Sequence, residues 1–375
     1  MTHAHAHAPV PELTDGVVLL RAHTDADVPA IVEQCTDPAS LRWTTVPRPY
    51  DANAAQAFLA MTRQEWAVPD RGRWWAIEWL DHPGGAPDFA GTIDLRPRGG
   101  GSAEVGFGLH PQARGHGLTA RALRLVCRWW WEQGGERVTW MAMAGHLASW
   151  RVAWSCGFAR HATLPGYLPH PDGLADAWVA SVGREDDLDR PASLWLDPVT
   201  RESSDVRLRA WRDDDGASCE PGDSPTHFMP PGAEPTPATF EAWVLRRRVR
   251  MSLGQSVHWC IADTAGDRAR GDLCLILEGQ QPGTAEIGYV LFPSARGRGL
   301  ASGAVRLAIE HAWADAADGG LGLRRLLAST VADNDASARV LQRAGFAEWG
   351  HEPEFCARDD GSYDDMRHWV LLRDA

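Results

Sequence analysis

The sequence predicts an α/β protein built from two copies of one domain, and three observations carry that prediction. Its 375 residues exceed the usual size of a single domain, about 150 residues. Residues 103–126 and 285–308 align without a gap, with 13 of 24 positions identical, which identifies an internal repeat. In both copies, short runs typical of strands alternate with longer helical runs. We therefore expect each half to form a mixed, mostly antiparallel sheet flanked by helices.

The repeat extends on both sides of this segment. Upstream, Leu20-Arg21-Ala22 matches Leu208-Arg209-Ala210, and downstream Gly157-Phe158 matches Gly345-Phe346 once an insertion near 314–322 is allowed. Each copy is too long for a solenoid repeat and has the size of a domain. An acidic, proline-containing stretch separates the copies. The predicted domains are residues 1–185 and 204–375, joined by a linker over 186–203.

The first half should open with a strand and a helix, because an apolar run precedes acidic residues at 25–27 that suit a helix N-terminus. Apolar runs separated by turns then predict a meander, and the apolar stretch after a glycine-rich turn predicts a buried helix. The expected strands are 17–21, 74–80, 89–95, 104–109 and 138–144, the expected helices are 118–131 and one beginning near Ser149, and the closing hairpin contains Trp178.

The second half repeats this order, with acidic residues at 213–215 in the place of 25–27. The same signals therefore predict the same elements. The expected strands are 206–209, 257–262, 271–277, 286–291 and 326–331, the expected helices are 300–313 and one beginning near Ser337, and the closing hairpin contains Trp369.

A glycine-rich loop recurs between the predicted strand and the predicted buried helix of each half. It reads Gln112-Ala113-Arg114-Gly115-His116-Gly117 in the first half and Ser294-Ala295-Arg296-Gly297-Arg298-Gly299 in the second. Glycine allows a ligand to approach the backbone, and successive N–H groups at a helix N-terminus attract an anion such as pyrophosphate. The loop has neither the lysine of a Walker loop nor the third glycine of a dinucleotide fingerprint. It predicts a phosphate cradle of another type; glycines that only ease helix packing are the alternative.

Together with its flanking motifs, the loop resembles the GNAT superfamily of acyl-CoA-dependent N-acetyltransferases. Within that superfamily, the chain resembles the branch of ribosomal-protein N-terminal and aminoglycoside acetyltransferases. The resemblance is carried by the E-[VI]-G-[FY]-x-L strand, the G-x-G loop, the N-x-x-S-x-x-[VL]-x-x-x-G-F segment and the final tryptophan strand. It covers nearly the whole chain, twice, and implies tandem GNAT-like domains with acetyl-CoA as co-substrate. These motifs say little about the acceptor.

The resemblance also implies where acetyl-CoA is held. Pantetheine pairs with the strand that ends at Leu109 or Leu291, and pyrophosphate sits on the loop amides. The residues implied are Leu109, Gln112, Arg114, Gly115, His116, Gly117 and Leu118 in the first half, and Leu291, Arg296, Gly297, Arg298, Gly299, Leu300 and Asn334 in the second. The first half departs from the pattern with His146 in the place of Asn334, and the second departs with Ser294 in the place of Gln112.

Acetyl transfer to an amine requires a base, because the amine arrives as an ammonium ion. Glu104 and Glu286 are the candidate catalytic bases, since they begin the strand where related enzymes often place one. An ion pair at the edge of the sheet is the alternative role for either residue. The resemblance suggests that the backbone N–H of Leu109 or Leu291 holds the oxyanion.

The leaving thiolate has no obvious proton donor. Many relatives use a tyrosine four residues before Gly-Phe, but Ala153 and Leu341 stand there. Ser149, Ser337 or a water molecule could assist, and we include Ser337 among the candidate catalytic residues. The alternative for Ser337 is a structural role as the N-cap of its helix.

Composition excludes several functions. The net charge of −13 repels phosphate backbones, so nucleic acid is not an expected partner. The seven cysteines include no C-x-x-C pair and are expected to be buried free thiols. No apolar run is long enough to span a membrane and no signal-peptide pattern begins the chain. We therefore expect a soluble, cytoplasmic protein that binds no metal and is pseudo-dimeric within one chain, which could be a monomer.

Three weaker features point to the acceptor or to metal. Tryptophans at 129–131 could line an aromatic pocket, and acidic pairs at 186–187, 359–360 and 364–365 could attract a polycation, but core packing and solvated loops are the commoner roles. His161 and His170 lie in the loop before the last strand of the first half. His3, His5 and His7 could hold a metal loosely.

The sequence thus predicts an N-acetyltransferase that moves acetyl from acetyl-CoA to a primary amine by direct attack, with the second half favoured as catalytic. The acceptor is either a small amine, such as an aminoglycoside or polyamine, or a protein N-terminus. The alternative function is a non-catalytic tandem module that binds or senses acyl-CoA.

Overall fold

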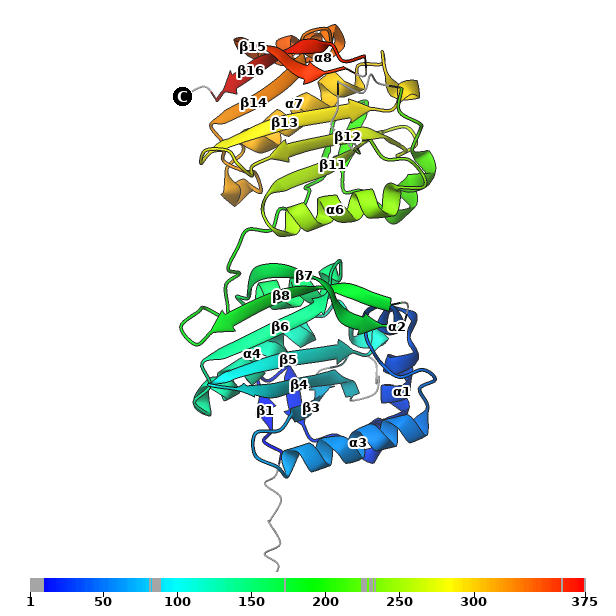
Figure 1. The fold of residues 1–375 in the computed structure, drawn as a ribbon, viewed down its shortest axis with the longest axis vertical. Coiled ribbons are helices and arrows are strands. Elements are labelled where there is room, and N and C mark those ends of the chain that lie inside the picture. Colours follow the sequence, from blue (N-terminus) through cyan, green and yellow to red (C-terminus); the bar gives the residue numbers. More distant parts are fainter. Residues whose placement is uncertain are drawn as a thin grey trace, which may run out of the picture. The chain divides into compact units, whose positions relative to one another are not determined.

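The computed structural model describes residues 10–80, 82, 89–171, 173–223, 228, 232, 234–358 and 360–373. His3, His5, His7 and Asp359, singled out in the sequence, lie outside these residues. The chain divides into two compact units, Met1–Ser193 and Leu194–Ala375 (Figure 1). Residues 186–193 of the predicted linker belong to the first unit and residues 194–203 to the second.

In the first unit, the described residues form an eight-stranded sheet of order β1-β2-β3-β4-β5-β6-β8-β7. Its strands are β1 (Leu13–Thr14), β2 (Val18–Arg21), β3 (Arg73–Trp79), β4 (Phe89–Gly99), β5 (Ser102–Leu109), β6 (Arg137–Met143), β7 (Ala159–His170) and β8 (Gly173–Gly183). The helices are α1 (Val28–Thr36), α2 (Pro38–Trp43), α3 (Ala52–Trp66), α4 (Leu118–Glu132) and α5 (Leu147–Ser155), with 3-10 turns η1 (Asp25–Asp27) and η2 (Pro111–Ala113). β5 and β6 pair in parallel, and the other neighbouring strands pair antiparallel.

The second unit has the same strand order, and its described residues again form eight strands, β15-β16-β14-β13-β12-β11-β10-β9. Its strands are β9 (Arg201–Glu202), β10 (Val206–Arg209), β11 (Ser256–Asp263), β12 (Ala269–Ile276), β13 (Thr284–Leu291), β14 (Arg325–Val331), β15 (Ala347–Ala357) and β16 (Tyr363–Leu372). The helices are α6 (Phe240–Ser252), α7 (Leu300–Trp313) and α8 (Asp335–Arg343), with 3-10 turns η3 (Asp213–Ser218), η5 (Pro293–Ala295) and η6 (Ala316–Asp318). The predicted α/β class, with a mixed and mostly antiparallel sheet in each half, is confirmed.

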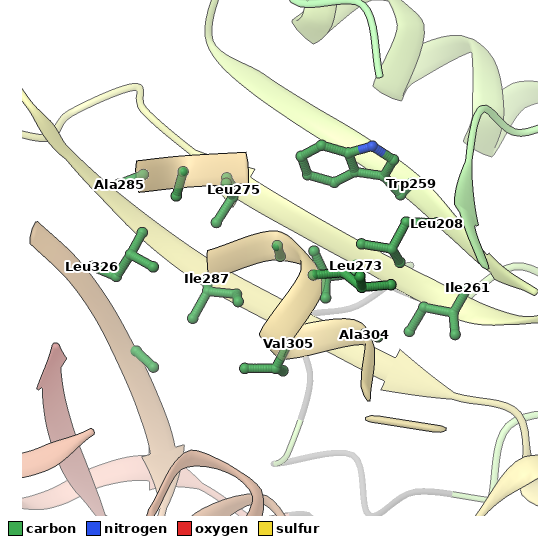
Figure 2. Close-up of a cluster of buried hydrophobic side chains, with 14 of the residues drawn as sticks. Leu208, Trp259, Ile261, Leu273, Leu275, Ala285, Ile287, Ala304, Val305 and Leu326 are labelled. Carbon is green, nitrogen blue, oxygen red and sulfur yellow. The ribbon is translucent and has the colours of Figure 1, made fainter. Parts of the chain in front are cut away.

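The predicted helix over 300–313 packs its apolar side against the sheet of the second unit. Figure 2 shows Ala304 and Val305 of this helix among side chains of the central strands, including Leu273 and Ile287. Trp259 is fully buried in the same cluster, with its indole N–H donated to the carbonyl of Val199 at 2.9 Å. Small residues on the helix allow this close approach, so the turn that precedes α7 is fixed relative to the sheet.

A buried ion pair recurs at the first long strand of each half. Arg209 donates to both carboxylate oxygens of Asp215 at 2.7 and 2.8 Å, and Arg21 does the same to Asp27 at 2.9 Å. In both copies these are the Leu-Arg-Ala arginine and the last residue of the acidic cluster. Bidentate pairs of this kind fix the geometry of the segments they join.

One predicted helix of the second half is wrong. The helix expected after 25–27 forms as α1, but residues 213–215 begin only the 3-10 turn η3, and α6 starts much later, at Phe240. Asp215 accepts hydrogen bonds from Arg209 and from the backbone N–H of Arg212. Asp27 accepts the same two kinds of hydrogen bond, from Arg21 and from the backbone N–H of Thr24, yet α1 follows it directly. The halves differ in the sequence after the turn, where six prolines between 221 and 237 disfavour a continuous helix.

None of the described helices combines the length and the apolarity that a membrane crossing requires. Among the cysteines, five are buried and two, Cys274 and Cys356, are partly exposed, and all carry free thiols.

Candidate active site

The parallel strands at the centre of each sheet separate before they end. β5 pairs with β6 only from Ser102 to Val105, and β13 pairs with β14 only from Thr284 to Glu286. The rest of β5 and β13, as far as Leu109 and Leu291, has no ladder partner on that side. Each half therefore presents a stretch of strand edge in the middle of its sheet, where an extended ligand can add main-chain contacts.

The glycine loop follows that strand in both halves and has the same backbone. Gly117 and Gly299 are the N-cap residues of α4 and α7, with φ of +73° and +80°. Gly115 and Gly297 also have positive φ, +82° and +73°. These values lie in the left-handed region that favours glycine. A Cβ at any of the four positions would have no atom within 4 Å, so the space over the loop amides is open.

In the second half, the loop lines a cavity of about 400 Å³ together with the end of β13 and with α8. Three arginines line it and no carboxylate does; they are Arg296, Arg339 and Arg343. Arg339 and Arg343 are exposed and form no ion pair within the described residues. Free guanidinium groups beside unpaired helix N–H groups favour a phosphate-bearing ligand. This cluster of positive charge stands out in a chain whose net charge is −13.

The same cavity contains the predicted residues Asn334 and Ser337. Asn334 is the N-cap of α8 and its side chain accepts the backbone N–H of Ser337 at 3.1 Å. The expectation that Ser337 caps the helix is therefore wrong, because Asn334 takes that place and leaves the serine hydroxyl free for another partner. That partner is Tyr289, whose Oη lies 2.9 Å from Ser337 Oγ. Burial raises the pKa of Tyr289 to about 12.

Of the other candidates in the second half, Leu291, Gly297 and Gly299 line the cavity, whereas Arg298, Leu300 and Glu286 do not. Leu300 is buried as the first residue of α7. Glu286 is half-buried, and its side chain makes no hydrogen bond or ion pair with any residue that the structure describes.

The first half has a cavity of about 460 Å³ at a different place. It lies over β4 and β5 and is lined by Asp94 and Glu104, not by the glycine loop. Glu104 is held by two guanidinium groups, Arg96 Nη2 at 2.9 Å and Arg98 Nη2 at 2.6 Å. Both of its carboxylate oxygens are therefore engaged.

Asp94 is the second carboxylate of this cavity, and it lies beside Arg96, the same arginine that holds Glu104. It is only 6% exposed, and burial raises its pKa to about 6 despite the opposing effect of Arg96. Arg96 Nε lies 2.9 Å from Asp94 Oδ1, yet neither atom completes a hydrogen bond, so the two groups are misaligned. Asp94 is thus a buried group poised to ionise near neutral pH.

The predicted residues around the first loop do not line one common cavity, and each has a different neighbour. Arg114 is paired with Asp37 at 2.7 Å, and His116 lies against Trp79 with ring centroids 4.6 Å apart. Gln112 lines a small separate hollow, and Gly115, Gly117, Leu109 and Leu118 do not line the large cavity.

His146, the residue in the place of Asn334, faces the first-half cavity. It is the N-cap of α5 but makes no side-chain cap. Its ring stacks on Trp43 at 4.7 Å, and burial, with Arg114 nearby, lowers its pKa to about 4. Ser149, the counterpart of Ser337, accepts the indole N–H of Trp140 at 3.1 Å.

The profile of the family described as "Acetyltransferase (GNAT) domain" matches residues 18–159 and residues 205–347. The chain belongs to the GNAT acetyltransferase family. The two matches together cover more than half of the chain and fall one in each structural unit, so this GNAT protein is a tandem member, as the repeat predicted.

Individual relatives match this GNAT protein over one half at a time. A probable N-acetyltransferase of Bacillus subtilis (strain 168), YjcK, is 34% identical over 103 residues, which are 27% of this chain and 54% of YjcK. The match therefore spans about half the length of that relative. RimJ of Mycobacterium smegmatis, solved in complex with CoA-disulfide, has a TM-score of 0.42 at 18% identity and covers 49% of this chain and 91% of its own. A GNAT acetyltransferase of Bacillus anthracis has a TM-score of 0.41 at 15% identity, with 47% and 99% covered.

Three features of the site were missed in the sequence of this GNAT protein. Asp94 carried a signal, because an aspartate inside an apolar strand run is a buried carboxylate unless the strand is at an edge. Tyr289 stood in the strand motif itself, at the position that Phe107 occupies in the first half. Arg339 and Arg343 gave no signal, since their position at the cavity depends on how α8 packs.

Proposed function

We propose that this protein is an acetyl-CoA-dependent N-acetyltransferase that acetylates a primary amine by direct attack, and that its second half holds acetyl-CoA and carries out the transfer. The observation that carries the proposal is the arginine-lined cavity over the second glycine loop. Its open loop amides and the guanidinium groups of Arg339 and Arg343 fit the pyrophosphate and phosphate groups of coenzyme A; the third arginine, Arg296, is paired with Asp223. The strand edge that ends at Leu291 fits an extended pantetheine arm.

Four groups of the second half would serve the reaction. Acetyl-CoA supplies an activated thioester. Glu286, whose side chain has no hydrogen-bond or ion-pair partner among the described residues, would accept the proton that the ammonium must lose. The backbone N–H of Leu291 would stabilise the oxyanion. Many relatives have a proton-donating tyrosine at the position of Leu341. In this chain the hydrogen-bonded hydroxyls of Tyr289 and Ser337 would instead donate the proton to the thiolate.

The loop proposal is tested by titrating acetyl-CoA into the full chain in a calorimeter. Gly297→Asn adds a side chain over the loop while keeping a residue type that tolerates positive φ. Gly319→Asn is a matched control, because Gly319 also has φ of +73° and open space around its Cβ but lies beyond the C-terminal end of α7. We expect Gly297→Asn to weaken binding at one site about tenfold or more and Gly319→Asn to bind as the wild type does. Equal binding by Gly297→Asn would overturn the assignment of the second loop.

Turnover separates the enzyme from the alternative of a binding or sensing module. With amines present, an enzyme releases free coenzyme A thiol from acetyl-CoA, whereas a sensor binds acetyl-CoA and releases none. The titration also counts sites. Two sites per chain would mean that both loops bind, and one site that is lost in Gly297→Asn would assign it to the second half.

A further inference from the structure

The cavity over the second glycine loop changes in character along helix α8. One stripe of the helix lines it, and its members are Ala336, Ser337, Arg339, Val340 and Arg343. Ser337 is hydrogen-bonded to Tyr289, which lies on β13 beside the separated strands. Because a helix rises about 1.5 Å per residue, Arg343 lies about 9 Å further along α8 than Ser337 does. The uncharged end and the cationic end of the cavity are therefore separate.

The two arginines of this stripe have no partner in the described part of the chain. Both side chains are exposed, and neither forms an ion pair or a side-chain hydrogen bond there. Residues four apart on a helix are neighbours on its surface, and like charges at that spacing destabilise the helix. Two guanidinium groups that the fold leaves uncompensated beside a cavity indicate a ligand that carries a concentrated negative charge.

Coenzyme A carries its negative charge in two separate places. The pyrophosphate follows the pantetheine arm, and a phosphate monoester stands on the 3′ position of the ribose. In the proposed function, the loop amides already account for the pyrophosphate. A phosphate monoester has a charge of about −1.5 to −2 near pH 7, which two guanidinium groups match. The 3′-phosphate is thus the group that remains for Arg339 and Arg343.

The first half lacks this pair of cations. Arg151 and Ser155 occupy the positions of the two arginines. Arg151 lies over the ring of Trp154, 5.0 Å from its centroid, and Ser155 Oγ donates to the carbonyl of Val152 at 2.9 Å. The glycine loop is common to both halves, whereas the paired guanidinium groups distinguish the second half from the first.

We propose that Arg339 and Arg343 bind the 3′-phosphate of coenzyme A and make the second half selective for acyl donors that carry it. The inference rests on the proposed function, because it takes the second half as the acetyl-CoA site. A donor with the same pantetheine arm and pyrophosphate but without that phosphate, such as acetyl-dephospho-CoA, reaches the strand edge and the loop and leaves the two arginines without a counter-ion. The second half therefore discriminates against it.

The test compares calorimetric titrations of the full chain with acetyl-CoA and with acetyl-dephospho-CoA. Gly115→Asn is present throughout, because it places a side chain over the first loop and leaves the second loop to be measured. We expect acetyl-CoA to bind at least about tenfold more tightly than acetyl-dephospho-CoA. Arg339→Gln combined with Arg343→Gln should reduce this preference to within about twofold and leave the binding of acetyl-dephospho-CoA unchanged.

Arg306→Gln combined with Arg324→Gln is the matched control. Both residues are exposed arginines of the second unit that do not line the cavity, so the control changes the net charge by the same amount. It should keep the full preference for acetyl-CoA. Glutamine and arginine have similar helix propensities, and unchanged binding of acetyl-dephospho-CoA shows directly that the site of the α8 variant is still folded.

Two results would overturn the inference. One is equal binding of the two ligands while both arginines are present. The other is a loss in the α8 variant that is the same for both ligands, which would assign the arginines to the pyrophosphate. Gly297→Asn tests the proposed function separately. If it weakens two ligands that bind equally, the second loop stands and only the selectivity fails; if it weakens neither while the α8 variant loses the preference, the arginines stand and the loop assignment fails.

Discussion

The two halves have the same strand order and the same glycine loop, yet their cavities lie on different parts of the unit. In the first half the cavity surrounds Asp94 and a set of aromatic side chains. In the second half it surrounds the loop and three arginines. The sheet and the loop backbone are therefore the shared scaffold, and a few side chains determine which part of the site is open.

Three exchanges between the halves fall at the candidate sites. Asp94 becomes Cys274 and Phe107 becomes Tyr289 on the central strands, while His146 becomes Asn334 before the next helix. Each exchange changes charge, hydrogen bonding or volume at the splayed strand without altering the strands themselves. The halves can thus be compared by changing equivalent residues, and each prediction below makes such a comparison.

The largest difference in turnover is expected between variants of the two equivalent glutamates on β5 and β13, Glu104 and Glu286. Glu286 has no partner in the described chain, whereas Glu104 is held by Arg96 and Arg98. If Glu286 is the base, Glu286→Gln should lower kcat about 100-fold with a smaller change in KM, because a general base acts mainly in the transition state. Glu104→Gln should leave the same kcat within about twofold, since its oxygens are already engaged.

Steady-state turnover of the full chain with acetyl-CoA across pH provides the measurement. The Gly115→Asn background, in which the first loop is blocked, keeps the first half from contributing turnover. Gly134→Asn is its control, because Gly134 has a similar φ of +85° and equally open surroundings. A pH–rate profile that is the same with and without Glu286 would assign that residue to structure.

The next difference concerns the two helix caps. His146→Asn gives α5 the cap that Asn334 gives α8, a gain of about 1 kcal/mol, and removes the stack on Trp43, a loss of about 0.5–1.5 kcal/mol. Near pH 7 the two effects should nearly cancel. Because burial lowers the pKa of His146 to about 4, the unfolded chain takes up a proton at higher pH than the folded chain does. The wild type therefore loses stability as pH falls from about 6.5 towards 4.

Thermal unfolding of the wild type and the variant at a series of pH values measures this difference. The other titrating groups of the chain are common to both proteins, so their contributions cancel in the comparison. The advantage of His146→Asn should grow on acidification by on the order of 2 kcal/mol, after allowance for the partial exposure of the ring. A difference that does not change with pH would mean that the imidazole is solvated in the folded protein.

Much of this site could be predicted from the sequence because it depends on the backbone. The loop glycines, the helix that follows them and the strand before them are local patterns with a fixed period, and the duplication shows each pattern twice. The repeated spacing of Arg21 and Asp27 and of Arg209 and Asp215 was also visible, although the ion pair that each forms was not.

The side-chain contacts of the site could not be predicted, because they depend on which residues the fold brings together. Arg98 and Glu104 are six residues apart around a turn, and nothing local shows that they pair. The helix α3 was not predicted, since its apolar positions are few, and its place is set by packing against the sheet. Such contacts decide that Glu104 is held by two arginines and that Asp94 lies beside one of them, Arg96.

The smallest expected difference lies in the hydroxyl groups at the strand end. Tyr289 Oη is 2.9 Å from Ser337 Oγ, while the first half has Phe107 there and its Ser149 accepts from Trp140. Tyr289→Phe removes one hydrogen bond of about 1 kcal/mol and should lower kcat about fivefold. Phe107→Tyr is the reciprocal control and should not change turnover, because Trp140 already donates to Ser149.

A double-mutant cycle distinguishes a shared proton donor from mere packing. If Tyr289 and Ser337 act as a unit, Tyr289→Phe combined with Ser337→Ala should lower kcat little more than either change alone, since the second removal finds the interaction already broken. Independent, multiplying losses would mean that the two hydroxyls contribute separately. In that case the missing family tyrosine has no single replacement, and departure of the thiolate in the second half would proceed with water as its proton source.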